Sequence, residues 1–506
     1  MANESEILDD EQPIDEHLES DEEVVTHGHH IGLRDFVILV LAFLGMMALY
    51  KFLPFAGKAN AGLAILFFVG VLWLTEALHV TITALLVPVL AVAFGLMDVG
   101  KSLSRFADPT IFLFFGGFAL ATALHVQGID RWIANRLLQL ARGHFGAAAI
   151  LLMLATAGLS MWISNTATAA MMLPLALGIL GSLDVEKDRN TYVFVLLGVA
   201  YAASIGGLGT PVGSPPNTIA VGYIKDSVPG LTGNPAWEHF GFTDWMSYGL
   251  PVMFVMLPAM IGVLYLIFRP NFHHRVEVRA FHFRWTSTRI TSVLIFLLAA
   301  CCWIFSKPLM ELSGIGKFDE FVAVTAAVLV GVTGVARWKQ IQENTEWGVL
   351  LLFGGGLTLS ALLGDSGASK VLADGVKSVV GGAGPLIIVL TVAAFIICLT
   401  ELSSNTAAAA LLIPLFGPVG VGLGMPGHLL PIVIGIGASL AFMLPVATPP
   451  NAIVFGTGYI KQKEMIKAGF WLVIVAIAVV TFFGAFVWHG AEAPAVEVHA
   501  ETVSTR

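Results

Sequence analysis

The chain has 506 residues, of which 57% are hydrophobic and only 12% are charged. Soluble globular proteins carry about 25% charged residues, so this composition excludes a soluble enzyme and indicates a chain that crosses a membrane many times. Three cysteines are too few for a disulfide-stapled scaffold, and their spacing matches no metal-binding motif.

The first segment, residues 1–34, holds 11 of the 35 acidic residues but one of the 26 basic ones, so the net charge of −9 belongs to it. Because it lacks aromatic residues, we expect a disordered, acidic cytoplasmic tail. It has no basic stretch before an apolar run, so no signal peptide is predicted. A solvated tail is favoured over a metal site at His27, His29 and His30.

Apolar runs long enough for membrane spans follow the tail, since a transmembrane helix needs about 20 mostly apolar residues. Two further apolar stretches are too long for one span, and each has Ser-Asn-Thr in its middle, which predicts a re-entrant hairpin. We therefore predict an all-α polytopic membrane protein with about eleven transmembrane helices and two re-entrant hairpins. The expected spans are 36–56, 61–79, 80–97, 109–128, 191–208, 246–268, 288–306, 320–337, 346–364, 430–447 and 468–488, and the hairpins are 147–182 and 384–417.

Basic residues give the expected orientation. With the N-terminus in the cytoplasm, 16 of the 26 Lys and Arg residues, including 11 of the 13 arginines, fall on the inner side. The segment 268–289 contains five arginines and is interpreted as a topology anchor, with a lipid headgroup site as the secondary interpretation. We expect a multi-pass protein of a bacterial-type plasma membrane, with the N-terminus cytoplasmic and the C-terminus outside.

The chain contains an internal duplication, because three motifs recur in the same order at offsets of 240, 234 and 238 residues. In the first pair, seven of eleven residues are identical. The pairs are SNTATAAMMLP at 164–174 with SNTAAAALLIP at 404–414, GSPPNTIAVGYI at 213–224 with ATPPNAIVFGTGYI at 447–460, and Phe-Gly-Gly at 115–117 with Phe-Gly-Gly at 353–355.

The two copies are expected to be inverted, because an odd number of spans separates the hairpins and places them on opposite membrane faces. Inverted repeats are typical of secondary transporters, whose sites lie near the bilayer midplane where broken helices meet. The expected organisation is an acidic tail at 1–34, scaffold spans at 35–108, a first repeat at 109–245, scaffold spans with the basic loop at 246–345, a second repeat at 346–490 and a C-terminal tail at 491–506.

The recurring motifs are polar and break helices inside apolar spans. Proline removes a backbone donor and frees carbonyl groups at the break, which suits a cation such as Na⁺. A helix that restarts after the break directs its amide groups and positive dipole end at the site, which suits a carboxylate. Neither motif contains Lys, Arg, Asp or His, so co-bound cations would have to balance the anion. A purely structural role is favoured for one such motif, but the matched repeat favours a binding site.

Other features have simpler interpretations. Glu401 and Glu76 could be proton or ion ligands, but a polar cap at a bend is favoured for each. Residues 95–102 match the phosphate-loop pattern without the strand and helix that nucleotide binding requires. The Gly354–Gly356 run is interpreted as close helix packing. Because no catalytic constellation is present, we expect neither an enzyme nor a nucleic-acid-binding protein.

These motifs, together with TEALHVTITALLVP at 75–88, resemble the divalent anion/Na⁺ symporter family of di- and tricarboxylate carriers over nearly the whole chain beyond the tail. The resemblance implies a homodimer in the lipid bilayer, with a scaffold part and a moving part in each protomer. It also implies elevator-type alternating access and cotransport of Na⁺ with a C4-dicarboxylate such as succinate, malate or fumarate, with no organic cofactor.

The resemblance also implies the site residues. The duplication supports the pairing of the two Na⁺ sites, since Ser160 and Thr400 are hydroxyl residues at the same offset as the tips. The implied Na⁺ ligands are Ser160, Ser164, Asn165 and the Gly213 carbonyl in one site, and Thr400, Ser403, Asn405 and the Ala447 carbonyl in the other. The implied anion contacts are Asn165, Thr166, Ser214, Asn405, Thr406, Thr448 and Pro449. Because Ala447-Thr448 replaces Gly213-Ser214, the two Na⁺ sites need not bind equally tightly.

Three alternatives stay open from the sequence. A Na⁺-independent dicarboxylate exchanger, or a citrate or sulfate carrier, would use the same motifs. An anion channel is a less favoured alternative, since channels also contain inverted repeats and re-entrant hairpins.

Overall fold

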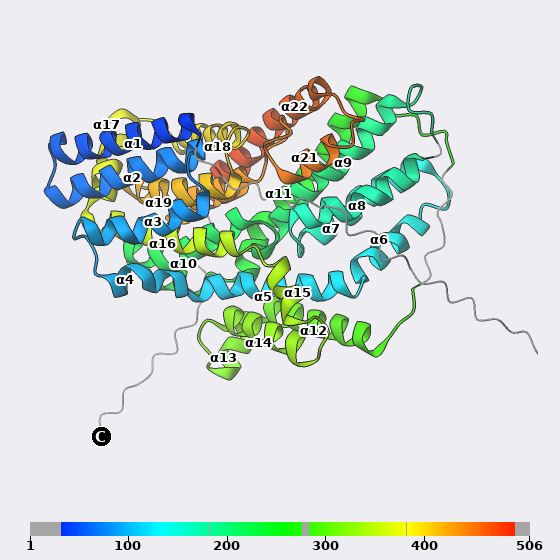
Figure 1. The fold of residues 1–506 in the computed structure, drawn as a ribbon, viewed down its shortest axis with the longest axis horizontal. Coiled ribbons are helices and arrows are strands. Elements are labelled where there is room, and N and C mark those ends of the chain that lie inside the picture. Colours follow the sequence, from blue (N-terminus) through cyan, green and yellow to red (C-terminus); the bar gives the residue numbers. More distant parts are fainter. Residues whose placement is uncertain (1–31, 182, 276–282, 381, 491–506) are drawn as a thin grey trace, which may run out of the picture.

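The computed structural model describes residues 32–181, 183–275, 283–380 and 382–490, and every element named within these ranges is a helix. Their arrangement is drawn in Figure 1. The acidic tail, with His27, His29 and His30, lies outside the described residues, as does part of the basic loop. The all-helical fold predicted for a polytopic membrane protein is confirmed.

We divide the helices into two sets, which we call the frame and the bundle. The two sets share one apolar core, and the frame helices α6, α16 and α17 also pack on the bundle helices α7 and α19. The frame consists of α1 (Leu33–Phe52), α2 (Gly57–Thr75), α3 (Val80–Ala93), α4 (Val99–Ser104), η1 (Arg105–Ala107), α5 (Pro109–Val126), α6 (Ile129–Gln139), α12 (Ser287–Ile304), α13 (Ser306–Ser313), α14 (Phe318–Val332), α15 (Trp338–Asn344), α16 (Trp347–Ser366) and α17 (Ala368–Val380). The bundle consists of α7 (Phe145–Ser160), α8 (Asn165–Leu180), α9 (Arg189–Gly206), η2 (Gly207–Gly209), η3 (Pro211–Gly213), α10 (Pro215–Thr232), η4 (Pro235–His239), α11 (Phe242–Phe268), α18 (Pro385–Leu399), α19 (Asn405–Gly422), α20 (Leu429–Ala438), α21 (Pro449–Phe455), α22 (Gln462–Phe482) and η5 (Phe483–Val487).

Nine helices in the described ranges are long and apolar enough to cross a membrane. The predicted total of about eleven spans stays a prediction, because some apolar helices are shorter than a full crossing. The span predicted at 191–208 agrees with the apolar helical run Arg189–Gly209, formed by α9 and η2. The span predicted at 430–447 differs, because α20 ends at Ala438 and the rest of the predicted span is not helical. Beyond each of these spans a Pro-Pro pair starts a new helix, α10 or α21, because proline is tolerated at the first helical positions but not in the interior.

The duplication predicted from the sequence is visible in the packing. Helix α5 packs on α14, and its counterpart α16 packs on α3. Likewise, α9 contacts α7 and α11, whereas α20 contacts α18 and α22. The two halves also interlock, since α10 packs on α19 and α21 packs on α8. Each half therefore contributes the same set of contacts, and the two halves of the bundle meet at their broken elements.

Glycines permit the closest of these contacts. A Cβ atom on Gly116 of α5 would lie 2.4 Å from the Ala323 carbonyl oxygen of α14, and one on Gly355 of α16 would lie 2.8 Å from Cα of Ala84 in α3. Either would clash, so only glycine allows these backbones to approach. The interpretation of Gly354–Gly356 as close helix packing is confirmed for Gly354 and Gly355, whereas a Cβ atom on Gly356 would fit, at 3.5 Å from Cβ of Ala410.

The phosphate-loop pattern has no nucleotide-binding context. Helix α3 precedes it where a strand would be needed, and Lys101 forms an ion pair of 2.7 Å with Asp365 of α16. The pattern is therefore part of a connection between frame helices.

Charged residues join the bundle to the frame at one end. Lys225 of α10 pairs with Glu320 of α14, Asp226 of α10 pairs with Arg105, and Asp244 of α11 pairs with Lys307 at 2.7 Å. The Lys225 and Glu320 side chains are only 11% and 5% exposed. These pairs position the first half of the bundle relative to the frame.

Candidate functional site

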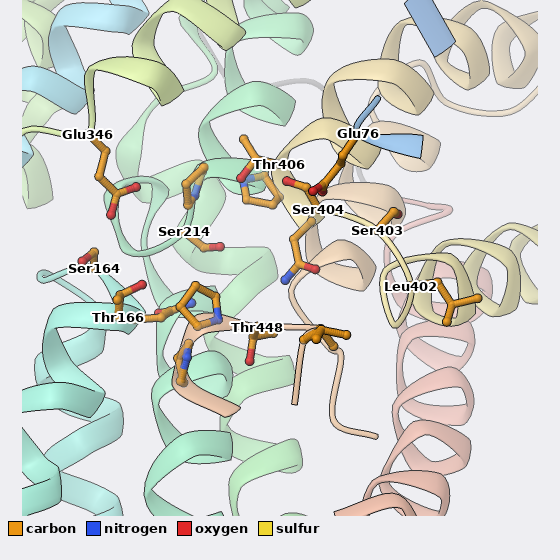
Figure 2. Close-up of a pocket in the computed structure, with 18 of the residues that line it drawn as sticks. Glu76, Ser164, Thr166, Ser214, Glu346, Leu402, Ser403, Ser404, Thr406 and Thr448 are labelled. Atoms are coloured by element: carbon orange, nitrogen blue, oxygen red, sulfur yellow. The ribbon is translucent and has the colours of Figure 1, made fainter. Parts of the chain in front are cut away.

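The hairpin tips and the Pro-Pro-Asn breaks enclose one cavity of about 430 Å³. Figure 2 shows Ser164 and Thr166 of one tip facing Ser404 and Thr406 of the other, with Ser214 and Thr448 between them. Four segments that lie far apart in the sequence thus meet where the two halves interlock. The lining residues are Leu74, Thr75, Glu76, Ser164, Asn165, Thr166, Ser214, Pro215, Pro216, Glu346, Leu402, Ser403, Ser404, Asn405, Thr406, Val446, Ala447, Thr448, Pro449 and Pro450.

Helix N-termini form much of the cavity wall. Helix α8 begins at Asn165, where the Ser164 hydroxyl accepts a hydrogen bond from the Ala167 amide at 3.3 Å, and α19 begins at Asn405 with the same cap from Ser404 at 3.4 Å. Helices α10 and α21 begin at the two Pro-Pro pairs. Free amide groups and positive dipole ends at helix N-termini favour a bound anion, as predicted from the sequence.

Two asparagine side chains hydrogen-bond to backbone carbonyl groups in the breaks. The Asn217 side-chain amide donates to the carbonyls of Gly207 and Thr210, at 2.7 and 2.8 Å. At the same offset of the repeat, the Asn451 amide donates to the carbonyls of Ala441 and Leu444, at 3.5 and 3.1 Å. Sequence analysis named the Pro-Pro-Asn motif but gave the asparagine no role, although its recurrence after both proline pairs was a signal.

Glu401 caps the second break. Its carboxylate accepts hydrogen bonds from the backbone amides of Phe442, Met443 and Leu444, at 2.7, 2.9 and 3.3 Å. These amides have no partner within a helix because α20 ends at Ala438. The interpretation of Glu401 as a polar cap at a bend therefore agrees with its contacts.

The residues implied as Na⁺ ligands bring together neutral oxygen atoms. In the first half, the Ser160 hydroxyl donates to Oδ1 of Asn165 at 2.6 Å. A Cβ atom on Gly213 would lie 2.6 Å from the Gly207 carbonyl oxygen and 3.0 Å from that of Met161, so carbonyl oxygens converge there. Unwound backbone carbonyls of this kind coordinate Na⁺ in other transporters.

In the second half, the Thr400 and Ser403 hydroxyls donate to carbonyls of their own helix, each at 3.1 Å. Oδ1 of Asn405 is buried and has no hydrogen-bond partner in the described part of the chain. An unpaired buried oxygen is costly unless a partner binds, so the donor set fits a small hard cation. No group of three His, Cys, Asp or Glu residues forms a metal site within the described ranges.

All seven residues implied as anion contacts line the cavity, namely Asn165, Thr166, Ser214, Asn405, Thr406, Thr448 and Pro449. Of the residues implied as Na⁺ ligands, Ser164, Asn165, Ser403, Asn405 and Ala447 line it as well. Ser160, Gly213 and Thr400 lie behind the wall and are fully buried or nearly so. Three of the eight implied cation ligands therefore lie behind the cavity wall, and the other five share the wall with the implied anion contacts.

The frame also lines the cavity, which sequence analysis did not predict. Glu76 directly follows α2, Glu346 directly precedes α16, and both are exposed. Figure 2 shows Glu346 beside the first tip and Glu76 beside the second. Glu346 lies 238 residues after Asp108, the N-cap of α5, so the offset of the Phe-Gly-Gly motifs marked the position without revealing its role.

Comparison with known proteins supports a transport function. A family profile described as "Citrate transporter" matches residues 70–422. An "Uncharacterized transporter" of Haemophilus influenzae is 56% identical over 460 residues, covering 89% of this chain and 97% of the relative. The chain belongs to the divalent anion/Na⁺ symporter-type family. A second member, the "Sodium-dependent dicarboxylate transporter SdcS" of Staphylococcus saprophyticus, is 31% identical over 487 residues, covering 90% of this chain and 91% of the relative.

The family member described here also shares its fold with a solved transporter. The crystal structure of the Alcanivorax borkumensis YdaH transporter matches with a TM-score of 0.55 at 14% sequence identity, covering 77% of this chain and 86% of that one. At this identity the match concerns the fold alone. Family and fold together identify a multi-pass membrane transporter and not an enzyme.

Proposed function

We propose that this transporter couples Na⁺ to the uptake of C4-dicarboxylates such as succinate, malate and fumarate. The observation that carries the proposal is the cavity wall. It combines helix N-termini for carboxylates with hydroxyl, amide and carbonyl oxygens for cations, and none of the described residues that line it is Lys, Arg or His. Without a cationic side chain, a dianion needs bound cations to balance its charge.

The proposed Na⁺ ligands and anion contacts are those implied by the sequence. Asn165 and Asn405 would each bind both species, with the carboxamide oxygen toward Na⁺ and the amide nitrogen toward a substrate carboxylate. The unpaired Oδ1 of Asn405 supports this division. The name of the Staphylococcus relative, which states sodium dependence and dicarboxylate transport, supports the choice of ions.

We further propose alternating access of the elevator type in a homodimer, with the bundle moving against the frame. The tips and breaks all belong to the bundle, whereas the frame contributes Leu74, Thr75, Glu76 and Glu346 to one side of the cavity. If the N-terminus lies in the cytoplasm, α2 ends and α16 begins on the cytoplasmic side of the membrane. Because Glu76 and Glu346 at these helix ends line the cavity, the described arrangement is then the inward-facing one.

The test is uptake of labelled succinate into proteoliposomes containing the full chain, with and without an imposed Na⁺ gradient. We expect uptake that requires external Na⁺ and saturates with succinate. Uptake that ignores Na⁺ but requires internal dicarboxylate would replace this proposal with an exchanger. Flux that neither saturates nor shows counterflow would identify a channel.

A further inference from the structure

The rim of the cavity has a different chemistry from its interior. Six lining residues are exposed, and the two charged ones among them are glutamates. No ion pair reaches either carboxylate in the part of the chain that the structure describes. The six residues are Leu74, Glu76, Glu346, Leu402, Val446 and Pro449. An anion in this cavity therefore rests on neutral dipoles and faces two unpaired carboxylates at the opening.

Glu76 occupies a position that disfavours glutamate in two ways. Its backbone has φ of 51°, in the left-handed region that glycine adopts at helix C-termini without strain. Its negative charge also follows the C-terminus of α2, where the helix dipole favours cations. A residue kept in strained backbone at a binding cavity points to a functional side chain.

Glu346 is placed at the opposite side of the opening. It is the N-cap residue of α16, and Figure 2 shows its side chain on the side of the first tip, near Ser164. Figure 2 shows the two glutamates at the same end of the cavity, one beside each tip. A group that extends from the tips toward the opening therefore passes between two negative charges.

Building on the proposed function, we infer that Glu76 and Glu346 restrict this carrier to dicarboxylates by repelling the third carboxylate of a tricarboxylate. Two carboxylates of a substrate are held at the two tips, where helix N-termini and cations offset their charge. A third has no such partner and projects toward the glutamates. Size does not exclude it, because a cavity of about 430 Å³ lies within the usual range for small-molecule sites.

Equilibrium binding to the purified full chain, at saturating Na⁺ and alkaline pH, tests the inference. The probes are succinate, tricarballylate and the monomethyl ester of tricarballylate, which has the size of the triacid but two charges. The unmodified protein should bind the ester far more tightly than the triacid. The double variant Glu76→Gln, Glu346→Gln should lower the ratio of the tricarballylate Kd to the succinate Kd at least about tenfold.

Glu343→Gln is the matched control, because Glu343 lies exposed on α15 and is absent from the cavity lining. It should leave the ratio unchanged, and thermal unfolding should confirm that all variants are folded. An unchanged ratio in the folded double variant would overturn the inference, as would equal exclusion of ester and triacid, which would mean that size decides. Succinate binding by the unmodified protein tests the proposed function separately. If the double variant does not lower the Kd ratio but succinate still binds, only the role of the glutamates is refuted. If the unmodified protein binds none of the probes, the proposed function is refuted.

Discussion

The two halves of the site have the same plan but stabilise their breaks differently. In the first half, the Thr210 hydroxyl donates to the Met161 carbonyl, and Lys225 and Asp226 tie the following helix to the frame. In the second half, the Glu401 carboxylate takes three backbone amides. Residue 401 is the repeat counterpart of residue 161. At this position of the repeat, the hydrogen-bond acceptor is the backbone carbonyl of Met161 in the first half and the side-chain carboxylate of Glu401 in the second half.

The difference extends to the proposed Na⁺ ligands. Oδ1 of Asn165 already accepts a hydrogen bond from Ser160, whereas Oδ1 of Asn405 is unpaired. A cation entering the first site must replace an existing hydrogen bond, and one entering the second site satisfies a vacant acceptor. The comparison shows that a duplicated site can keep its geometry while its two copies diverge in anchoring and in readiness to bind.

The largest expected effect comes from the ties between the first half and the frame. Glu320→Leu leaves Lys225 buried without its partner, which should lower the free energy of unfolding by about 3–5 kcal/mol. The double variant Lys225→Met, Glu320→Leu should recover most of the loss, because apolar side chains replace both charges. Thermal unfolding in detergent measures both effects.

An exposed pair supplies the control for this experiment. Lys339 and Glu343 are 84% and 60% exposed, so Lys339→Met should change the free energy of unfolding by less than about 1 kcal/mol. Equal effects of the buried and exposed substitutions would show that the tie contributes nothing. The second half has no equivalent pair in the described part of the chain. Lys461 follows Gly-Tyr-Ile there as Lys225 does in the first half, but it forms none of the ion pairs.

The next test replaces the Glu401 contacts of the second break with the hydroxyl contact that stabilises the first break. Glu401→Met gives the second half the residue of the first and leaves three amides unpaired, which should destabilise the protein by about 3 kcal/mol. Adding Leu444→Thr supplies the counterpart of Thr210 and should restore about 1 kcal/mol through a new hydroxyl-to-carbonyl bond. Chemical denaturation followed by tryptophan fluorescence measures both steps. A double variant no more stable than the single one would mean that the two breaks differ in backbone geometry as well as in side chains.

Asn165→Ala and Asn405→Ala should each reduce the affinities for Na⁺ and for the anion by roughly a hundredfold, because each asparagine is proposed to contact both species. Sodium-dependent succinate uptake and binding in proteoliposomes measure the change. Asn344→Ala, on the exposed end of α15, is the matched control and should transport normally. Normal transport by either site variant would refute the assignment for that half.

The smallest expected effect separates the two proposed Na⁺ sites. Thr400→Val should weaken Na⁺ binding about tenfold through loss of one oxygen ligand. Ser160→Ala removes a ligand too, but it also frees Oδ1 of Asn165, so its effect should be smaller, about threefold. Direct binding of radioactive sodium to the purified protein distinguishes them. Equal effects would show that the Ser160–Asn165 hydrogen bond does not oppose binding.

The sequence predicted those features that depend on local pattern and repetition. Apolar run length marked most of the helices, and the repeated motifs contain both hairpin tips and all the residues proposed as anion contacts, which line the cavity. It failed where a span is interrupted, because hydropathy does not distinguish the continuous span expected at 430–447 from a helix that ends at Ala438 and is followed by an apolar, non-helical segment. It also missed short amphipathic helices such as α6 and α17, which lie between spans and lack the length of a crossing.

The contribution of the frame to the site could not be predicted. Glu76 and Glu346 lie outside the matched tips and breaks, and the helices that carry them reach the cavity only through tertiary packing. Likewise, the partners of Asn217 and Glu401 are backbone groups, which leave no trace in side-chain identity. A repeat alignment extended to each acidic residue would have flagged Glu346, but only the packing shows that it lines the cavity.

The charged groups at the cavity and the helix dipoles that face it lie on different parts of the molecule. The neutral groups proposed to hold the substrate belong to the bundle, whereas Glu76 and Glu346 belong to the frame. In the proposed mechanism the substrate moves with the bundle. It is therefore close to the negatively charged frame glutamates when the site faces the cytoplasm, and away from them when the site faces outward. Stationary wall charges would then speed unloading into the cell without altering the final accumulation, which the ion gradient alone determines.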